Sequence, residues 1–246
     1  MFRTDLSGRT ALVTGSASGV GRGIALALAE DGASVAVHYH SSEAEARATA
    51  EEAEERGAPA ATTVRADVTD ETDVDAAFDA VEEELGSVDV LVNNVGDFAP
   101  DHWAAQDVAD WRRVYETNLV GTMLCARRAL PAMREKGWGR IVNVGYASAE
   151  KGLVNPKNFP YFAAKAGVLM FTRMLAADTQ DDGVTVNAVS PYVVETSDEF
   201  PEDAPRGRWA TVDDLVQVVR FFCDDASRYV SGENVEVDGG WLPEDV

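Results

Sequence analysis

Short runs of β-branched and apolar residues alternate with longer helical patterns from one end of the chain to the other. Seven runs are candidate strands, at residues 11–13, 35–37, 62–64, 88–92, 141–144, 184–186 and 235–237. Helical stretches lie between them, at about 21–30, 42–56, 72–85, 108–136, 161–178 and 212–225. Strands joined by helices run parallel through right-handed crossovers. The pattern therefore predicts an α/β fold, with a doubly wound, seven-stranded parallel sheet and helices on both faces.

No internal repeat, low-complexity segment or long linker interrupts this alternation. A chain of 246 residues, 46% of them hydrophobic, is long enough to bury one large core. We therefore expect residues 1–246 to form a single domain.

The charge of the chain is strongly acidic. Its 43 acidic and 21 basic residues give a formal net charge of −22, and only four of the basic residues are lysines. Such a surface repels nucleic acid and anionic membranes, so neither is an expected partner. The acidic residues are dispersed along the helical stretches, which is typical of proteins from salt-loving microbes. An ordinary acidic cytosolic protein is the alternative.

Other features exclude several classes of protein. Cys125 and Cys223 are far apart in helical patterns, and the three histidines form no recognisable ligand set, so we expect neither a disulfide framework nor a metal site. The N-terminus lacks an apolar signal core, and no apolar run approaches the length of a membrane span. We expect a soluble, cytoplasmic protein.

A glycine-rich turn follows the first candidate strand and leads directly into a helix. Small residues let the backbone approach a pyrophosphate, whose negative charge is favoured by free amides and the helix dipole. The turn therefore predicts dinucleotide binding through Thr14, Gly15, Ser18, Gly19, Val20 and Gly21.

The second strand ends at Tyr39-His40-Ser41-Ser42, about where an acidic residue would accept the ribose hydroxyls of NAD. Without a carboxylate to repel a 2′-phosphate, and with hydroxyls and an imidazole to bind it, this stretch favours NADP(H) over NAD(H). No arginine stands there, and Ser18 occupies a loop position that could have carried one. Alternatively, Ser41 or Ser42 only caps the following helix.

Further polar residues follow the third and fourth strands, where a doubly wound sheet binds its ligand. They are Asp67 and Val68, then Asn93, Asn94 and Gly96. Asp67 is a candidate acceptor for an adenine amino group, or a cap for the next helix. Asn118 lies inside a helical pattern, where asparagine is unfavourable, so we expect it to have a polar task.

Tyr161 and Lys165 are four residues apart at the start of a helical pattern, which places them on one helix face. A nearby ammonium favours phenolate and lowers the pKa of a tyrosine toward working pH. The pair is therefore a candidate for acid/base catalysis.

Taken together, the motifs resemble those of the short-chain dehydrogenase/reductase family, most closely its 3-oxoacyl-carrier-protein reductase branch. They span residues 8–241 and comprise Thr14-Gly15-x-x-x-Gly19-x-Gly21, Asp67, Asn93-Asn94-x-Gly96, Asn118, Tyr161-x-x-x-Lys165, Asn187-x-x-x-Pro191 and Val237-Asp238-Gly239-Gly240. One such motif is weak evidence, but seven in register are strong evidence. The resemblance implies a Rossmann-fold oxidoreductase.

The resemblance also implies the role of each site residue. Tyr161 would protonate the carbonyl oxygen as hydride leaves the nicotinamide, Lys165 would bind the ribose, and Asn118 would bind a water in a proton relay. Asn93 and Gly96 would line the cofactor. The backbone around Val189 to Val193, which includes Pro191 and Tyr192, would contact the nicotinamide end, and Val194 would also bind the cofactor.

The chain departs from the family pattern in three places. The family usually has a serine just after the fifth strand, but here that position falls at Gly145-Tyr146, and either Ser148 or Tyr146 is the candidate replacement. Tyr192 replaces a usual glycine, and we expect it to obstruct or reshape the substrate pocket. Residues 197–208, which correspond to the active-site lid, are short and acidic, so we expect poor cover for long acyl chains.

These observations predict an NADP(H)-dependent enzyme that interconverts a carbonyl and an alcohol, with a 3-oxoacyl thioester or a small ketone as substrate. The alternative is a dinucleotide-binding protein that has lost turnover and acts as a sensor or assembly partner. The resemblance implies a homodimer or homotetramer assembled through the two longest helical stretches.

Overall fold

The computed structural model describes residues 4–147, 149, 156–197, 200–201 and 204–241. The strands are β1 (Thr10–Val13), β2 (Ser34–Tyr39), β3 (Ala61–Arg65), β4 (Val90–Asn93), β5 (Gly139–Val144), β6 (Val184–Pro191) and β7 (Asn234–Val237). The α-helices are α1 (Gly19–Glu30), α2 (Glu43–Arg56), α3 (Glu71–Leu85), α4 (Val108–Tyr115), α5 (Gly121–Lys136), α6 (Phe159–Asp178) and α7 (Val212–Cys223).

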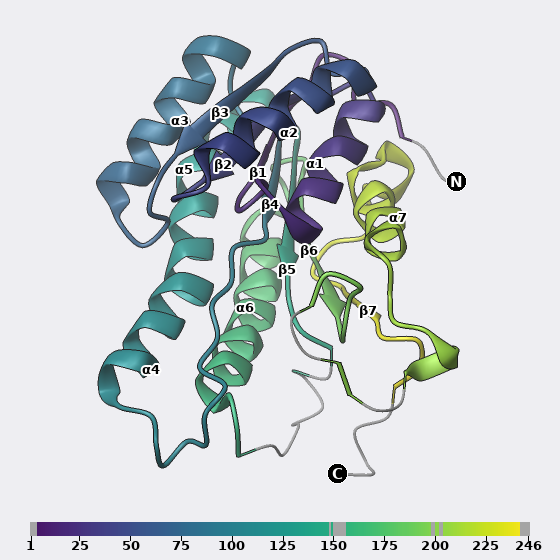
Figure 1. The fold of residues 1–246 in the computed structure, drawn as a ribbon. Coiled ribbons are helices and arrows are strands. Elements are labelled where there is room, and N and C mark those ends of the chain that lie inside the picture. Colours follow the sequence, from purple (N-terminus) through teal and green to yellow (C-terminus); the bar gives the residue numbers. More distant parts are fainter. Residues whose placement is uncertain (1–3, 148, 150–155, 198–199, 202–203, 242–246) are drawn as a thin grey trace.

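The seven strands form one parallel sheet in the order β3-β2-β1-β4-β5-β6-β7. Helices α1, α2 and α7 cover one face, and α3, α5 and α6 cover the other (Figure 1). Because helices cover both faces, β1, β4 and β5 are buried along their whole length. The predicted doubly wound fold is confirmed.

The order of the strands in the sheet indicates where a ligand binds. The chain moves outward from β1 to β3 and then returns to the other side of β1 with β4. Ligands of doubly wound sheets bind at this switch point, outside the carboxyl ends of the strands. The segments after β1, β2, β4 and β5 all leave the sheet at that edge (Figure 1).

The predicted continuous helix over residues 108–136 is wrong in one respect. A π-helical turn, Glu116–Val120, separates α4 from α5. Asn118 lies in this turn and is fully buried. A hydrophobic pattern does not reveal the extra residue of a π turn, but such turns are frequent at functional sites.

Three further structural findings concern possible partners of the chain. Within the described part of the chain, no helix is long and apolar enough to cross a membrane. The same residues contain no group of three or more His, Cys, Asp or Glu that could hold a metal ion. Cys125 and Cys223 are buried free thiols.

Candidate active site

The glycine-rich turn between β1 and α1 is built so that its backbone is open to a ligand. Gly15 and Gly19 have φ of 64° and 56°, a left-handed conformation that glycine adopts without strain. A Cβ on Gly21 would lie 2.4 Å from the Gly15 carbonyl oxygen and 2.6 Å from Asn94 Nδ2. No side chain fits at this position, so the helix begins directly behind the turn.

Asn94 holds this turn from β4. Its Nδ2 donates to the carbonyl oxygens of Thr14 at 3.0 Å and Gly15 at 3.2 Å, and its backbone N donates to Thr14 Oγ1 at 2.9 Å. Asn93, by contrast, is buried, and its Nδ2 donates to Asn143 Oδ1 at 2.9 Å. The side chain of Asn93 therefore ties β4 to β5, and only Asn94 supports the turn.

His38 on β2 is a structural residue that the sequence analysis missed. Its Nδ1 accepts from Gly15 N at 3.0 Å, and its Nε2 lies 3.2 Å from the Ala66 carbonyl oxygen. Burial lowers the pKa of His38 to about 4, so the imidazole is neutral and can accept one hydrogen bond while donating the other. The only feature of the sequence that could have indicated this role was a polar residue within the apolar run of β2.

Protonation of His38 should destabilise the fold. Because its folded pKa is about 4 and its unfolded value is 6.5, the unfolded chain takes up the proton first as pH falls. We expect the free energy of unfolding to drop by about 3 kcal/mol between pH 6.5 and 4 from this residue. Chemical denaturation across this pH range measures the drop.

The matched pair for this measurement is His38→Gln and His40→Gln. His38→Gln has no imidazole to protonate and should show a flatter pH dependence than the wild type. His40→Gln, which changes an exposed neighbour, should keep the wild-type slope. An unchanged slope in His38→Gln would contradict the assignment.

Asp67 lies beside an open pocket of about 590 Å³ that is also lined by His40, Val68 and Gly96. Its Oδ1 accepts from Thr69 N at 2.9 Å and Thr69 Oγ1 at 2.7 Å, and these hydrogen bonds lower its pKa below the usual value. The cap of α3 is Asp70, so the alternative capping role for Asp67 is wrong. Asp67 presents an ionised carboxylate at the pocket.

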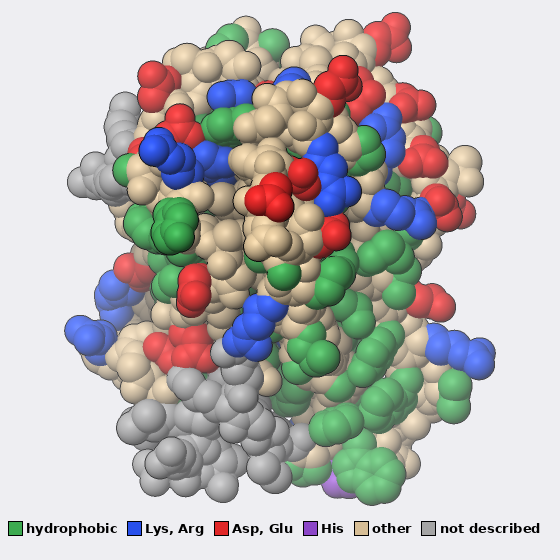
Figure 2. Space-filling view, turned by 180° about the vertical axis from the view of Figure 1, so that it is seen from behind, with side chains coloured by type: hydrophobic (Ala, Val, Ile, Leu, Met, Phe, Trp, Pro, Cys, Tyr) green, Lys and Arg blue, Asp and Glu red, His purple; other side chains and the backbone are tan. Residues whose placement is uncertain are grey.

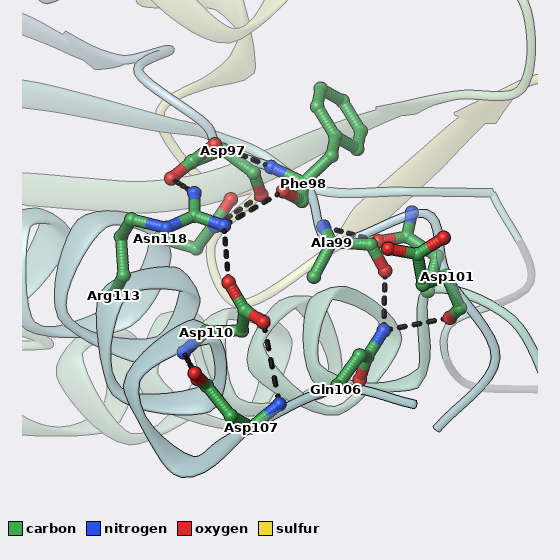
Figure 3. Close-up of polar contacts among 10 residues, drawn as sticks. Asp97, Phe98, Ala99, Asp101, Gln106, Asp107, Asp110, Arg113 and Asn118 are labelled. Carbon is green, nitrogen blue, oxygen red and sulfur yellow. Dashed lines mark hydrogen bonds and ion pairs between the residues drawn. The ribbon is translucent and has the colours of Figure 1, made fainter. Parts of the chain in front are cut away.

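Asn118 is oriented by two hydrogen bonds and leaves its oxygen free. Its Nδ2 donates at 2.9 Å to the carbonyl oxygens of both Asp97 and Val114. Its buried Oδ1 has no hydrogen-bond partner. The ion pairs of Arg113 with Asp97 and Asp110 fasten the segment after β4 onto α4 (Figure 3). The π turn and this segment together fix Asn118 Oδ1 as a buried acceptor that has no hydrogen-bond partner.

Gly96 separates the Asn118 acceptor from Lys165. A Cβ on Gly96 would lie 3.1 Å from Asn118 Oδ1 and 3.7 Å from Lys165 Nζ. Lys165 is buried on α6, where its Nζ donates to the Val144 carbonyl oxygen at 2.7 Å. Burial lowers the pKa of Lys165 to about 8. The lysine is still mostly protonated at neutral pH and has donor capacity left.

Tyr161 lies one helical turn before Lys165, with its ring centroid 5.6 Å from Lys165 Nζ. The expected lowering of the Tyr161 pKa is not found. Burial, with a smaller contribution from Tyr146, raises the pKa of Tyr161 well above its usual value. The Lys165 ammonium is bonded to the Val144 carbonyl, and it lowers the pKa of the phenol by less than burial raises it. Tyr161 is therefore a protonated acid at neutral pH.

Aromatic rings enclose Tyr161. Its ring centroid lies 4.4 Å from that of Phe98 and 5.7 Å from that of Tyr146, and Tyr146 lies 5.2 Å from Phe162. Burial raises the pKa of Tyr146 above its usual value, so its hydroxyl is also protonated. Ser148 lies outside the described residues, and Tyr146 is the candidate replacement that the structure brings next to Tyr161.

Tyr192 follows β6 and turns toward the C-terminus of the chain. Its ring stacks on Trp241 with centroids 3.8 Å apart and planes at 10°, and it lies 6.4 Å from the Tyr146 ring. Trp241 follows the last sequence motif and was not predicted to be near the site. The Tyr192 ring is thus held between Trp241 and the edge of the aromatic cluster.

The site as a whole fits a nicotinamide dinucleotide. The amides of Gly15 and Ser16 are bonded to His38, and the turn then leads into the backbone amides at the start of α1. Asp67 and Gly96 line a pocket at the ends of β3 and β4. Beyond Gly96 are the unpartnered Asn118 oxygen and the buried ammonium of Lys165. Such an arrangement can bind pyrophosphate and ribose hydroxyls and deliver a proton from Tyr161 to a bound oxygen.

Comparisons with known proteins agree with this geometry. A family model described as enoyl-(acyl carrier protein) reductase, of the short-chain dehydrogenase/reductase type, matches residues 15–242. A 3-oxoacyl-[acyl-carrier-protein] reductase from Aquifex aeolicus is 34% identical over 245 residues, covering 96% of this chain and 98% of that protein. The cis-4-hydroxycyclohexanecarboxylate dehydrogenase of Sinomonas cyclohexanicum is 40% identical over 189 residues, covering 72% of this chain and 75% of the relative.

Among solved structures, a gluconate 5-dehydrogenase from Burkholderia cenocepacia in complex with NADP and tartrate superposes with a TM-score of 0.88. It is 33% identical in sequence, and the match covers 97% of this chain and 96% of that structure.

Proposed function

Since the chain belongs to the short-chain dehydrogenase/reductase family and is an oxidoreductase, we propose that it transfers hydride between NADP(H) and a carbonyl or alcohol substrate. The observation that carries this proposal is that Asn118 Oδ1 and Lys165 Nζ both flank Gly96, with the Tyr161 ring beside Lys165. Three chemically matched groups from one helix, α6, and a π turn support a proton-delivery site more specifically than any of them does alone.

The protein side of the reaction is proton delivery and positioning. When bound, the nicotinamide ring supplies or accepts the hydride. Tyr161 holds the proton at Oη and gives it to the substrate oxygen, and the nearby charge of Lys165 stabilises the phenolate that is left. Asn118 Oδ1 accepts a hydrogen bond from water, which connects the site to a source of replacement protons. Tyr146, or Ser148, donates to the substrate oxygen and orients it.

Aromatic side chains support an apolar carbonyl compound as substrate. Phe98, Tyr146 and Phe162 surround the Tyr161 ring, and the Tyr192–Trp241 stack borders the same cluster. A ring ketone or a short acyl group gains most from burial against such surfaces. The names of the relatives, which include a 3-oxoacyl reductase and a hydroxycyclohexanecarboxylate dehydrogenase, span these two substrate classes.

We also propose that the chain assembles as a homodimer or homotetramer through α4, α5 and α6. Figure 2 shows apolar side chains gathered over the lower part of the face that these helices form. Val108 and Met170, which are 65% and 70% exposed, belong to these helices, as do Phe159 and Met174. Apolar patches of this kind mark interaction sites.

A substrate panel tests the catalytic proposal. The purified protein is mixed with NADPH and a series of ring ketones, small linear ketones and 3-oxoacyl thioesters, in low and molar salt because of the net charge of −22. We expect oxidation of NADPH with at least one class, at rates that depend on Tyr161. Tight nucleotide binding without Tyr161-dependent turnover of any substrate would instead support the sensor or assembly role.

A further inference from the structure

The end of β2 carries no cation in the sequence, but the structure brings one there from the neighbouring strand. Arg65 is the last residue of β3 and pairs in register with Tyr39, the last residue of β2. Its Nε donates to the carbonyl oxygen of His40 at 3.1 Å. One guanidinium edge is therefore fixed where the chain turns from β2 toward α2, while Nη1 and Nη2 are left for another partner.

The charge of Arg65 is not compensated by the protein. No carboxylate of the described residues forms an ion pair with it, and its side chain is exposed. The neighbouring arginines differ in this respect: Arg22 pairs with Glu52, and Arg47 pairs with Glu43. Arg112, which lines the pocket beside His40 and Asp67, also forms no ion pair with the described residues, but only Arg65 is hydrogen-bonded to the end of β2.

Hydroxyls without a capping partner lie on the turn that follows His40, the residue bound by Arg65, and on the turn before α1. Ser18 and Ser42 are the N-cap residues of α1 and α2, yet neither side chain makes a capping hydrogen bond. Ser41, between His40 and Ser42, is exposed, and its hydroxyl has no partner among the described residues. The alternative reading of Ser42 as only a helix cap is therefore not supported.

Two acidic side chains on the segments that flank Arg65 are bonded to other residues. Asp67, two residues further, accepts from Thr69 N and Oγ1. In the first turn of α2, Glu43 is paired with Arg47 and the exposed Glu45 follows it. None of these carboxylates forms an ion pair with the arginine, and a dianion with several acceptor oxygens matches the donors that a guanidinium and neighbouring hydroxyls offer.

We propose that Arg65 is the specificity-determining cation for the 2′-phosphate of NADP(H), with the Ser41 and Ser42 hydroxyls as further donors. This inference rests on the proposed nucleotide-dependent function and adds the residue that selects between the two nucleotides. Arg65 takes the place of the positive charge that Ser18 does not supply, and it does so from β3 rather than from the turn after β1 or the end of β2.

Isothermal titration calorimetry of NADP⁺, NAD⁺ and adenosine 2′,5′-bisphosphate tests the assignment. The proteins are the wild type, Arg65→Gln, Arg65→Lys and the control Arg47→Gln, which removes an exposed charge from nearby α2. We expect Arg65→Gln to weaken the binding of NADP⁺ and of the bisphosphate by about tenfold. NAD⁺ affinity should change by less than about twofold, and Arg65→Lys should recover part of the loss.

The informative quantity is the ratio of NADP⁺ to NAD⁺ affinity. An unchanged ratio in Arg65→Gln overturns the inference, whether both affinities fall together or neither falls. An equal loss in Arg47→Gln also overturns it, because the effect would then be a general change of charge. If the wild type binds neither nucleotide, the proposed function itself fails. Retained NAD⁺ binding by Arg65→Gln confirms that the variant is folded.

Discussion

Replacing Tyr161 with phenylalanine will lower kcat/KM for the best substrate of the panel by about 10³-fold, the usual contribution of a positioned general acid. The buried Tyr161 phenol stays protonated at neutral pH, since burial raises its pKa, and phenylalanine keeps the ring while removing the proton. The ring contacts with Phe98 and Tyr146 remain possible in this variant, so the pocket keeps its shape. Steady-state kinetics with NADPH measure the effect.

Two further tyrosine variants give this experiment its controls. Tyr229→Phe changes a fully exposed ring and should leave kcat/KM unchanged. Tyr146→Phe should lower it by less than Tyr161→Phe does if the hydroxyl of Tyr146 only orients the substrate oxygen. NADPH affinity, measured by fluorescence, should stay within about twofold of the wild type in all three variants. Unaltered turnover in Tyr161→Phe would remove Tyr161 from the mechanism.

The sequence was sufficient for the parts of the fold that depend on local pattern. Apolar runs separated by amphipathic helices predicted all seven strands and their parallel arrangement. The glycine turn after β1 was predictable because the positive φ of Gly15 and Gly19 and the closeness of Gly21 to the Gly15 carbonyl allow little else. These features require only knowledge of a residue and its near neighbours in the chain.

Features that depend on contacts between distant segments were not predictable. The hydrogen bond from Gly15 N to His38 Nδ1 and that from Arg65 Nε to the His40 carbonyl join residues more than 20 positions apart. The π turn at Asn118 shifts the helix register without a change in composition. The pKa of Tyr161 was predicted in the wrong direction, because four-residue spacing specifies a shared helix face but not the depth of burial.

Replacing Lys165 with methionine should have opposite effects on activity and stability. Methionine has a similar length but no charge, so kcat/KM should fall by about 10²-fold or more as the phenolate loses its neighbouring cation. Burial lowers the pKa of Lys165 from 10.5 to about 8, which means that the charged ammonium destabilises the folded chain at neutral pH. Methionine removes this destabilisation but also removes the hydrogen bond to the Val144 carbonyl. The net result should be a rise of about 2 kcal/mol in the free energy of unfolding at pH 7.

The pH dependence of stability shows whether Lys165→Met is stabilised by removal of the buried charge or by better packing. Wild-type stability should increase as pH rises from 8 to 10.5, because the unfolded chain holds the Lys165 proton longer than the folded chain does. Lys165→Met lacks this slope, so its advantage should disappear by about pH 10.5. Denaturant unfolding of both proteins at pH 7, 9 and 10.5 measures the difference. A destabilised Lys165→Met at pH 7 would mean that the ammonium contributes to the fold, whereas an inactive but stabilised variant identifies a lysine retained for its role in the reaction.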